Sequence, residues 1–467
     1  MGKGRTINLL DASHSPAKTI WMLAWPVILD QAFQTMVQYV DSAMVGSLGA
    51  VATAAVAANS STIWLVNGLM YSFGVAFSVL AARQIGASEK EGVHHTVRQA
   101  LMAALFFSVV TTSLMRSIAP RLPHWIGVDQ EVVPQAVSYM SYIALAYPFT
   151  ILFAYLSNLL RSSGDTRSPL ISNIITNLTN IVGNYFLIFP TRRVHFFNAE
   201  FTIYGADLGV KGAAIATAGA TVLSALILFG VLIFKDSPLR TPFRGVSWRV
   251  DWPLMKQVLK LGTPLALERA VLSFGQIVLT ILVTHISTVA LAAHHLAITA
   301  ESITYMPAFG FSIAATTLVA QSLGAQERQM SLDFARKCLQ WTVALMTTTG
   351  FFMFIFAPQL MQFFTKDTRV IVLGAKVLRI EAFAQPFFAL SIVIGGILRG
   401  AGDTKWPFIN SLIGMWLVRL VPATLLILVF NLGLEAAWVC MVADLVVRGL
   451  LNYYRYHKKE WLTAWKH

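Results

Sequence analysis

Six carboxylic acids lie within long apolar stretches of this 467-residue sequence, and they are the residues best suited to do chemistry there. They are Asp30, Asp41, Glu268, Glu301, Glu381 and Asp444. A charged side chain inside a membrane is costly, so acids retained there commonly bind ions, protons or cationic solutes. Burial favours the neutral form of a carboxyl group, which allows proton exchange near neutral pH. The expected chemistry is reversible binding of a proton or a cation.

Asp30 and Glu268 occupy matching places, because each follows a proline by four residues. We expect Glu268 to bind the coupling ion or the substrate. The alternative is a structural ion pair between Glu268 and either Arg269 or Arg419. Adjacent helical residues do not face each other, which weighs against Arg269 as the partner.

Glu301 precedes Tyr305 by four residues, so both side chains lie on one face of a helix. A cation could sit between the carboxylate and the aromatic ring. Soft and flat side chains also suit a cleft that binds varied amphipathic solutes. The expected cleft residues are Trp64, Tyr71, Tyr305 and Met306. The alternative is that these side chains face lipid or pack between helices.

The last two acids have structural alternatives. Glu381 could take part in coupling or could face the outer mouth of the protein. Asp444 precedes Arg448 by four residues, the spacing of an ion pair along one helix face. We expect Asp444 to be structural.

The elements that must position these acids are membrane-spanning helices. The chain is 56% apolar and 12% charged, whereas a soluble domain has about 25% charged residues. Many apolar blocks reach the roughly 20 residues that a spanning helix needs, without the strict alternation of a β-barrel. We expect twelve spans, near residues 18–46, 51–82, 97–120, 133–160, 168–190, 209–234, 254–285, 290–322, 335–357, 371–398, 406–430 and 433–455.

The net charge of +13 comes mainly from Lys and Arg residues between the apolar blocks. With the N-terminus inside, 24 of them fall on the cytoplasmic side and about nine on the other. The positive-inside rule then places both termini in the cytoplasm of a multi-pass protein of the cell membrane, expected to be a bacterial inner membrane. The same distribution argues against a nucleic-acid partner. Cys338 and Cys440 predict neither a disulfide framework nor a metal site.

The sequence repeats itself at a shift of 238 residues. Rare residues carry the match, including Pro26 with Pro264 and the segment Leu160–Pro169 with Leu398–Pro407. Because the shift spans six helices, the two halves have the same orientation, related by a pseudo-twofold axis along the membrane normal. We expect an N-terminal six-helix lobe at 1–234, a cytoplasmic linker at 235–253 and a C-terminal six-helix lobe at 254–467. Substrate sites lie at such repeat interfaces near the midplane.

The paired segments share the pattern LR-x-x-GDT-[RK]-x-P. The glycine allows a tight turn and the proline opens the next helix. Asp165 and Asp403 can cap that helix or pair with Arg161 and Arg399 at the cytoplasmic rim. We interpret these segments as structural loops, with direct ion binding as the alternative.

Nearly the whole chain resembles the multidrug and toxic compound extrusion (MATE) family, a branch of a larger group that also contains lipid-linked oligosaccharide flippases. The resemblance rests on the two LR-x-x-GDT loops and on Val37–Gly46, Leu208–Thr217, Ala292–His295 and Met306–Gly310. It implies twelve helices in two six-helix bundles that enclose a V-shaped cleft. It also implies export of cationic or amphipathic organic compounds in exchange for Na⁺ or H⁺.

The resemblance implies a coupling role for Asp41, which matches the first-span acid that binds protons or Na⁺ in several family members. It also implies that Asn180 and Asn184 lie nearby, and these share a helix face. Many relatives have Asp where Asn184 stands. The missing charge favours H⁺, although Na⁺ at Asp41 stays open. The alternative is that the asparagines join helices by hydrogen bonds.

We therefore expect a secondary active exporter with no cofactor beyond its coupling ion, H⁺ or Na⁺. Its partners would be small organic cations and the lipid bilayer, and we expect a monomer. A lipid-linked precursor flippase of the same larger group is the alternative. The sequence carries no zinc motif, no serine–histidine set and no P-loop, so we expect that the protein is not an enzyme.

Overall fold

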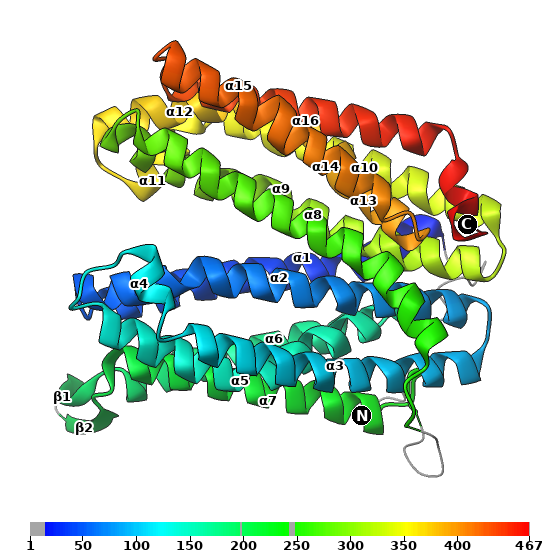
Figure 1. The fold of residues 1–467 in the computed structure, drawn as a ribbon, viewed down its shortest axis with the longest axis horizontal. Coiled ribbons are helices and arrows are strands. Elements are labelled where there is room, and N and C mark those ends of the chain that lie inside the picture. Colours follow the sequence, from blue (N-terminus) through cyan, green and yellow to red (C-terminus); the bar gives the residue numbers. More distant parts are fainter. Residues whose placement is uncertain (1–14, 197–198, 242–247, 467) are drawn as a thin grey trace. The chain divides into compact units, whose positions relative to one another are not determined.

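The computed structural model describes residues 15–196, 199–241 and 248–466. The remaining positions include most of the N-terminal tail and part of the expected linker. Figure 1 shows that the described chain is built of helices, apart from one short hairpin. In the first half the elements are α1 (Pro16–Gly46), α2 (Ala50–Gly86), α3 (Lys90–Ile118), α4 (Leu122–Ile126), α5 (Val133–Ser162), α6 (Arg167–Leu187), β1 (Pro190–Phe196), β2 (Ala199–Ala206) and α7 (Gly209–Phe234).

The second half is helical but more interrupted. Its elements are α8 (Trp252–Thr284), α9 (Thr288–Gly324), α10 (Arg328–Ile355), α11 (Ala357–Phe364), α12 (Thr368–Ala382), α13 (Gln385–Gly400), α14 (Lys405–Leu412), η1 (Ile413–Leu420), α15 (Val421–Thr424), η2 (Leu425–Val429), α16 (Leu434–His457) and η3 (Glu460–Lys466). Within the described residues, each of the twelve expected spans coincides with one helix or with consecutive helical segments.

Two expected spans of the second half are irregular. The span expected at 371–398 consists of α12 and α13, which meet at a 59° bend. Pro386 stands in the first turn of α13, where its missing N–H and fixed φ favour a new helix over continuation of α12. The span expected at 406–430 alternates between α-helix and the wider π-helix of η1 and η2.

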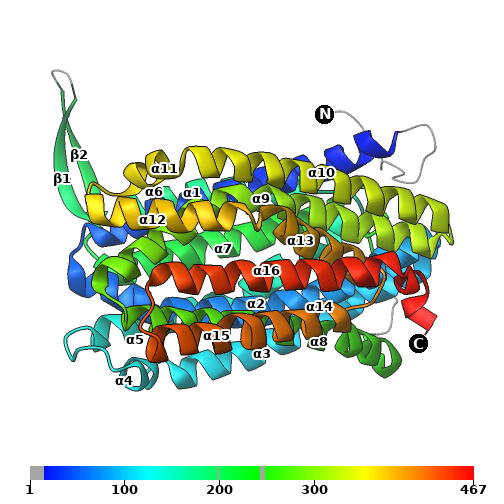
Figure 2. The ribbon, with the colours of Figure 1, turned by 90° about the horizontal axis from the view of Figure 1, so that it is seen from above.

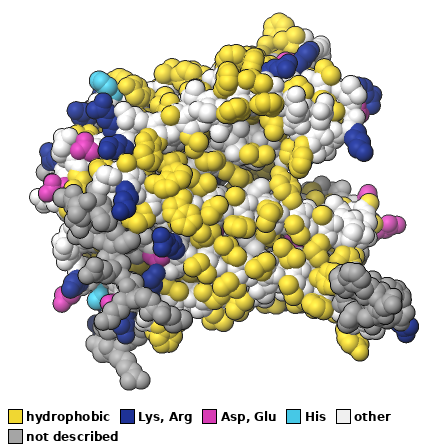
Figure 3. Space-filling view, turned by 180° about the vertical axis from the view of Figure 1, so that it is seen from behind, with side chains coloured by type: hydrophobic (Ala, Val, Ile, Leu, Met, Phe, Trp, Pro, Cys, Tyr) yellow, Lys and Arg dark blue, Asp and Glu magenta, His cyan; other side chains and the backbone are white. Residues whose placement is uncertain are grey.

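Apolar composition fits a membrane location. Among the described residues, eight helices are long and apolar enough to cross a membrane, or nine if the bent pair α12–α13 forms one span. Helices α1, α6 and α16 fall outside this set because they carry the acids and amides of the candidate sites. In Figure 3, apolar side chains cover the middle of the face and Lys and Arg lie mainly toward its margins.

The chain forms two compact units by its internal contacts. Unit 1 holds residues 29–81 and 90–256, and unit 2 holds the described residues up to 28, 82–89 and 257–466. Helices α1 and α2 therefore each contribute residues to both units. In unit 1, α7 packs against α5 and α6, and α3 packs against α5. In unit 2, α9, α10, α13 and α16 lie side by side (Figures 1 and 2).

The sequence repeat extends to the backbone. Gly164 and Gly402, 238 residues apart, have φ angles of 88° and 86°, which suit the glycines of the two LR-x-x-GDT loops. The residue after each glycine donates its N–H to the carbonyl of Leu160 or Leu398, at 2.9 and 2.8 Å. The two loops are therefore the same turn built twice.

Within unit 2, the end of α2 crosses the end of α9 at two glycines of the repeat. A Cβ added to Gly86 would lie 1.9 Å from the carbonyl oxygen of Gln321, and one added to Gly324 would lie 2.0 Å from that of Arg83. Both pairs of positions, 86 with 324 and 83 with 321, are 238 apart. The contact is thus self-complementary, like an interface on a twofold axis.

Candidate functional site

A buried ion pair joins three helices of unit 1. The Nη2 of Arg161, in the last turn of α5, lies 2.7 Å from the Oδ2 of Asp30 on α1. The side-chain amide of Asn173 on α6 donates to the other carboxylate oxygen, Oδ1. Asp30 is only 2% exposed, so the two donors supply the hydrogen bonds that water would give.

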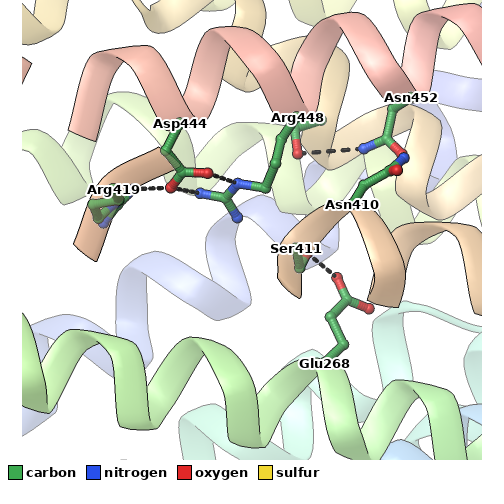
Figure 4. Close-up of polar contacts among 8 residues, drawn as sticks. Glu268, Asn410, Ser411, Arg419, Asp444, Arg448 and Asn452 are labelled. Atoms are coloured by element: carbon green, nitrogen blue, oxygen red, sulfur yellow. Dashed lines mark hydrogen bonds and ion pairs between the residues drawn. The ribbon is translucent and has the colours of Figure 1, made fainter. Parts of the chain in front are cut away.

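The equivalent residues of unit 2 form the same arrangement. The Nη2 of Arg399, in the last turn of α13, lies 3.6 Å from the Oε1 of Glu268 on α8. The hydroxyl of Ser411 on α14 donates to the same oxygen at 3.4 Å (Figure 4). Glu268, Arg399 and Ser411 follow Asp30, Arg161 and Asn173 by 238 residues each. We call these the first and second triads.

The triads correct the expected partner of Glu268. Its ion pair is with Arg399, and neither Arg269 nor Arg419 provides the charge. Residue 419 is instead bound to Asp444, at 2.7 Å. The long arginine side chains at the ends of α5 and α13 extend back into the spans, because their apolar stems can be buried while their heads reach a charge.

The loop aspartates therefore find other cations. Asp165 accepts a hydrogen bond from the backbone N–H of Ser168 at 3.1 Å, as the capping alternative predicts. It also lies 2.6 Å from the Nζ of Lys235, which follows α7. Asp403 lies 2.9 Å from Arg455, near the end of α16. The expected pairs with Arg161 and Arg399 are wrong. Each loop is instead tied to the last spanning helix of its own half.

Asp41 lies in a second polar site of unit 1, formed by α1, α6 and α7. The side-chain amide of Asn184 donates to Asp41 Oδ1 and also to Asn180 Oδ1, the latter at 3.1 Å. Asn180 in turn donates to Thr217 Oγ1 at 2.9 Å. The structure thus brings together the three residues that the sequence analysis grouped, and it adds Thr217. The phenol of Tyr139 lies within electrostatic reach of Asp41.

The direction of these hydrogen bonds determines what the Asp41 site can do. Asn184 faces Asp41 with its NH₂ group, and both N–H bonds are used. An amide donor stabilises a carboxylate, and a carboxylic acid could also remain there. A hard cation such as Na⁺ needs oxygen ligands, so this arrangement suits a proton better than a metal ion.

Asp444 is the most strongly paired acid of unit 2. Its Oδ1 lies 2.6 Å from Arg448 Nε, which confirms the ion pair expected along α16. Its Oδ2 accepts from Arg448 Nη2 at 2.8 Å and from Arg419 Nη2 at 2.7 Å. Figure 4 shows both guanidinium groups around this one carboxylate. Arg419 belongs to the π-helical segment η1, a feature common at functional sites and one that side-chain spacing does not predict.

Two further acids lie close to Arg419. Glu301 on α9 and Glu381 on α12 are buried and lie within electrostatic reach of each other and of Arg419. Among the described residues, neither carboxylate oxygen of Glu381 has a hydrogen-bond partner. The alternative that Glu381 faces the outer mouth is wrong, because the residue is fully buried just before the α12–α13 bend.

The charges of this cluster do not balance. Glu301, Glu381 and Asp444 supply three carboxyl groups, whereas Arg419 and Arg448 supply two guanidinium groups. Like charges that share a buried site cannot all stay ionised without compensation. One proton or one further cation makes the cluster neutral.

The expected cleft residues have different surroundings. Trp64 on α2 is 64% exposed. Tyr71 and Met306 are partly buried. The ring of Tyr305 packs against Phe388 and Phe309, with centroids 5.3 and 5.9 Å away. Tyr305 is thus in an aromatic cluster one helical turn from Glu301.

Comparison with known proteins identifies the family. The family model described as MatE matches residues 26–186 and 264–425, one copy in each half. The chain belongs to the MatE family. It is a membrane transporter and not an enzyme, as the sequence analysis predicted.

Similar proteins are known over the full length of this MatE transporter. A probable multidrug resistance protein NorM of Thermotoga maritima is 29% identical over 95% of this chain and 93% of its own. The uncharacterized transporter YisQ of Bacillus subtilis is 24% identical over 95% of both chains. A solved structure described as the outward-facing conformation of a multidrug resistance MATE family transporter matches with a TM-score of 0.88 at 21% identity, over all of both chains.

The structural likeness confirms the predicted fold class, an all-helical polytopic membrane protein with twelve helices in two lobes. A MOP superfamily transporter from Pyrococcus furiosus, described as having a binding pocket of reverse polarity, also matches, with a TM-score of 0.87 at 21% identity over both chains. The shared fold therefore accommodates binding pockets of different polarity.

Proposed function

We propose that this MatE transporter exports cationic or amphipathic organic compounds in exchange for protons, by alternating access. The observation that carries the proposal is the unbalanced charge of the buried cluster in unit 2. Its Glu301 and Glu381 carboxyls need one more positive charge, which either a proton or an organic cation can supply. Two ligands that neutralise the same site compete, and competition is the basis of exchange.

The coupling residues of this proposal are Asp41, with Asn180 and Asn184, in unit 1, and Glu301, with Glu381, in unit 2. Protonation from outside releases the organic cation, and loss of the proton to the cytoplasm restores the binding site. Each ligand can shift the conformational equilibrium only through its different affinity for the two states. We assign Glu268 a structural role, because it is paired with Arg399 as Asp30 is paired with Arg161.

Protons are favoured over Na⁺ by the amide that faces Asp41. Asn184 presents N–H groups to the carboxylate, whereas Na⁺ would need the amide oxygen there. The names of relatives favour efflux of varied compounds, since NorM and MdtK proteins are named for multidrug resistance. We place Trp64, Tyr71, Tyr305 and Met306 at the substrate path, where soft and aromatic surfaces tolerate varied solutes.

Location and assembly follow from the same reading. We place the transporter in a bacterial inner membrane, as a monomer with both termini in the cytoplasm, because Lys and Arg gather in the segments assigned to that side. A lipid-linked precursor flippase would have to bind an anionic headgroup. The cluster around Arg419 has more acids than bases, which favours a cationic substrate.

The test is efflux of ethidium, a permanent organic cation, from proteoliposomes under either a H⁺ or a Na⁺ gradient alone. We expect efflux with H⁺, little with Na⁺, and at least a tenfold loss in Asp41→Asn and in Glu301→Gln, the scale on which general acid–base groups contribute. Asp333→Asn is the matched control, because this acid is exposed near the start of α10. Efflux driven by Na⁺ alone, or unchanged in both site variants, would refute the proposal.

A further inference from the structure

A buried histidine of unit 2 has no role in the exchange as proposed. His294 lies on α9, seven residues before Glu301, so both side chains are on the same helix face two turns apart. It is only 2% exposed. The buried ring needs a structural or functional reason, because burial of polar nitrogens without partners is unfavourable.

Hydrogen bonding fixes the protonation state of this ring. The indole N–H of Trp438 on α16 donates to His294 Nδ1 at 3.1 Å, and the two rings meet edge to face. An indole nitrogen can only donate, so Nδ1 must carry a lone pair. The hydrogen of the neutral ring is therefore on Nε2. A proton could enter Nδ1 only if the bond from Trp438 broke.

The Nε2–H group is buried and has no hydrogen-bond partner among the described residues. The same holds for two other donors of unit 2, Arg419 Nε and Gln385 Nε2, and for both oxygens of the Glu381 acceptor. Arg419 lies within electrostatic reach of His294 and of both glutamates. Unpartnered donors and acceptors in one polar cluster are the setting in which ordered water bridges buried groups.

We propose that His294 is a positioning residue for proton exchange, a neutral imidazole locked by Trp438 whose Nε2–H holds bridging water against the Glu301 and Glu381 carboxyls. This inference rests on the proposed proton exchange. The ring does not itself take up the proton. Its fixed donor favours the charged form of the carboxyls, so that they release a proton to the cytoplasm and become ready for an organic cation.

The groups that share the site define what else could titrate there. Arg419 and His295 act directly on the His294 ring. The groups around Arg419 are Glu301, Glu381, Asp444, Arg448 and Cys440. The variants must therefore change the Nε2 donor without removing any of these charges.

Two amide substitutions separate the nitrogens of the ring. Asn can place its oxygen where Nδ1 stands, which keeps the acceptor for Trp438 but loses the Nε2 donor. Gln can place its NH₂ group where Nε2 stands, which keeps the donor but loses the acceptor. A merely structural role through Trp438 is best preserved by His294→Asn, whereas positioning through Nε2–H is best preserved by His294→Gln.

The experiment measures ethidium efflux from proteoliposomes across about pH 5 to 8, where histidine and raised carboxyls titrate. We expect His294→Asn to move the midpoint of the pH profile upward by about one unit, a tenfold change in proton affinity. His294→Gln should restore the midpoint, although its rate falls because the ring packing is lost. Each variant is compared at equal thermal stability and equal reconstituted amount.

A structural role would give the opposite order, with His294→Asn like the wild type and His294→Gln impaired, and that result would overturn the inference. Equal midpoints in both variants would also overturn it. Trp438→Phe provides a second route, because it frees Nδ1 for protonation and should add a loss of efflux on the acid side. A wild type without H⁺-driven efflux would instead refute the proposed function, and this inference would fall with it.

Discussion

The two triads differ in strength although they occupy equivalent positions. In the first, Arg161 approaches Asp30 to 2.7 Å, and the two side chains are 7% and 2% exposed. In the second, Arg399 lies 3.6 Å from Glu268, and the exposures are 23% and 12%. The repeat has preserved the roles of the residues while allowing one pair to loosen. An acid present in both halves therefore marks helix packing.

The acids without an equivalent show the opposite pattern. The positions that match Asp41, Glu301 and Glu381 in the other half hold Leu279, Ile63 and Ile143. These acids have amide, hydroxyl or carboxyl neighbours, and the cluster around Glu301 and Glu381 is short of positive charge. The comparison separates acids that hold the repeated fold from acids that carry exchange.

Breaking the first triad should have the largest effect. Asp30→Asn keeps the size of the side chain but leaves the Arg161 guanidinium buried without its counter-ion. Removal of one partner from a buried pair costs about 3–5 kcal/mol. We expect that loss in the free energy of unfolding, measured by SDS titration in mixed micelles. A loss below about 1 kcal/mol, the scale of an exposed pair, would mean that burial does not strengthen this triad.

The glycine crossing tests a place where the repeat has stayed symmetric. Gly86→Ala and Gly324→Ala each push a methyl group against a backbone carbonyl, so each should destabilise by about 1–3 kcal/mol. Because the contact is self-complementary, the two losses should agree within about 0.5 kcal/mol. The same SDS titration measures both. A clear inequality would show that the crossing is asymmetric, as the triads are.

The second triad should be weaker. Arg399 keeps some contact with solvent, and its 3.6 Å separation from Glu268 is long for an ion pair. Glu268→Gln should therefore lose about 1 kcal/mol or less, the scale of partly exposed pairs. The comparison with Asp30→Asn in the same titration is the decisive quantity. Equal losses would remove the distinction between the triads.

The weakest pair lies outside the membrane spans and gives the lower end of this scale. His95 Nε2 lies 2.8 Å from Asp251 Oδ2, and both side chains are about one-third exposed, at 34% and 33%. The hydrogen bond to His95, then that from the Leu254 backbone N–H, lowers the pKa of Asp251 below its usual value.

A lowered folded-state pKa stabilises the fold above the unfolded value of about 3.9, and the benefit disappears as pH falls through the folded value. Asp251→Asn should therefore cost up to about 0.5 kcal/mol at pH 7, after allowance for solvent screening. The difference from wild type should vanish toward about pH 3. Thermal unfolding at the two pH values measures it, and a difference that grows in acid would contradict the assignment.

Much of the fold could be predicted from the sequence, because local patterns determine it. The apolar blocks set the spans, and the repeat of rare residues predicted that Gly164 and Gly402 make the same turn. The partners of Arg161 and Arg399 could not be predicted, since these side chains bind acids 131 residues away in both halves. Such contacts depend on how helices pack, which spacing along one helix does not reveal.

The candidate site was predicted unevenly for the same reason. Asp41, Asn180 and Asn184 were grouped correctly because a family pattern links them across the chain. The burial of Glu381 was missed, because the bend before Pro386 changes the face that α12 presents. Arg419 was considered only as a partner for Glu268. Its position in a π-helical turn shifts the register of that face.

The most direct test of the central claim counts the protons released when an organic cation binds. Purified protein in weakly buffered detergent is mixed with tetraphenylphosphonium, and a pH-sensitive dye reports the release. We predict about one proton per bound cation in the wild type and in Glu268→Gln, and no release in Glu301→Gln. Release that survives in Glu301→Gln but disappears in Glu268→Gln would contradict the account, because the repeated acid would then carry the exchange.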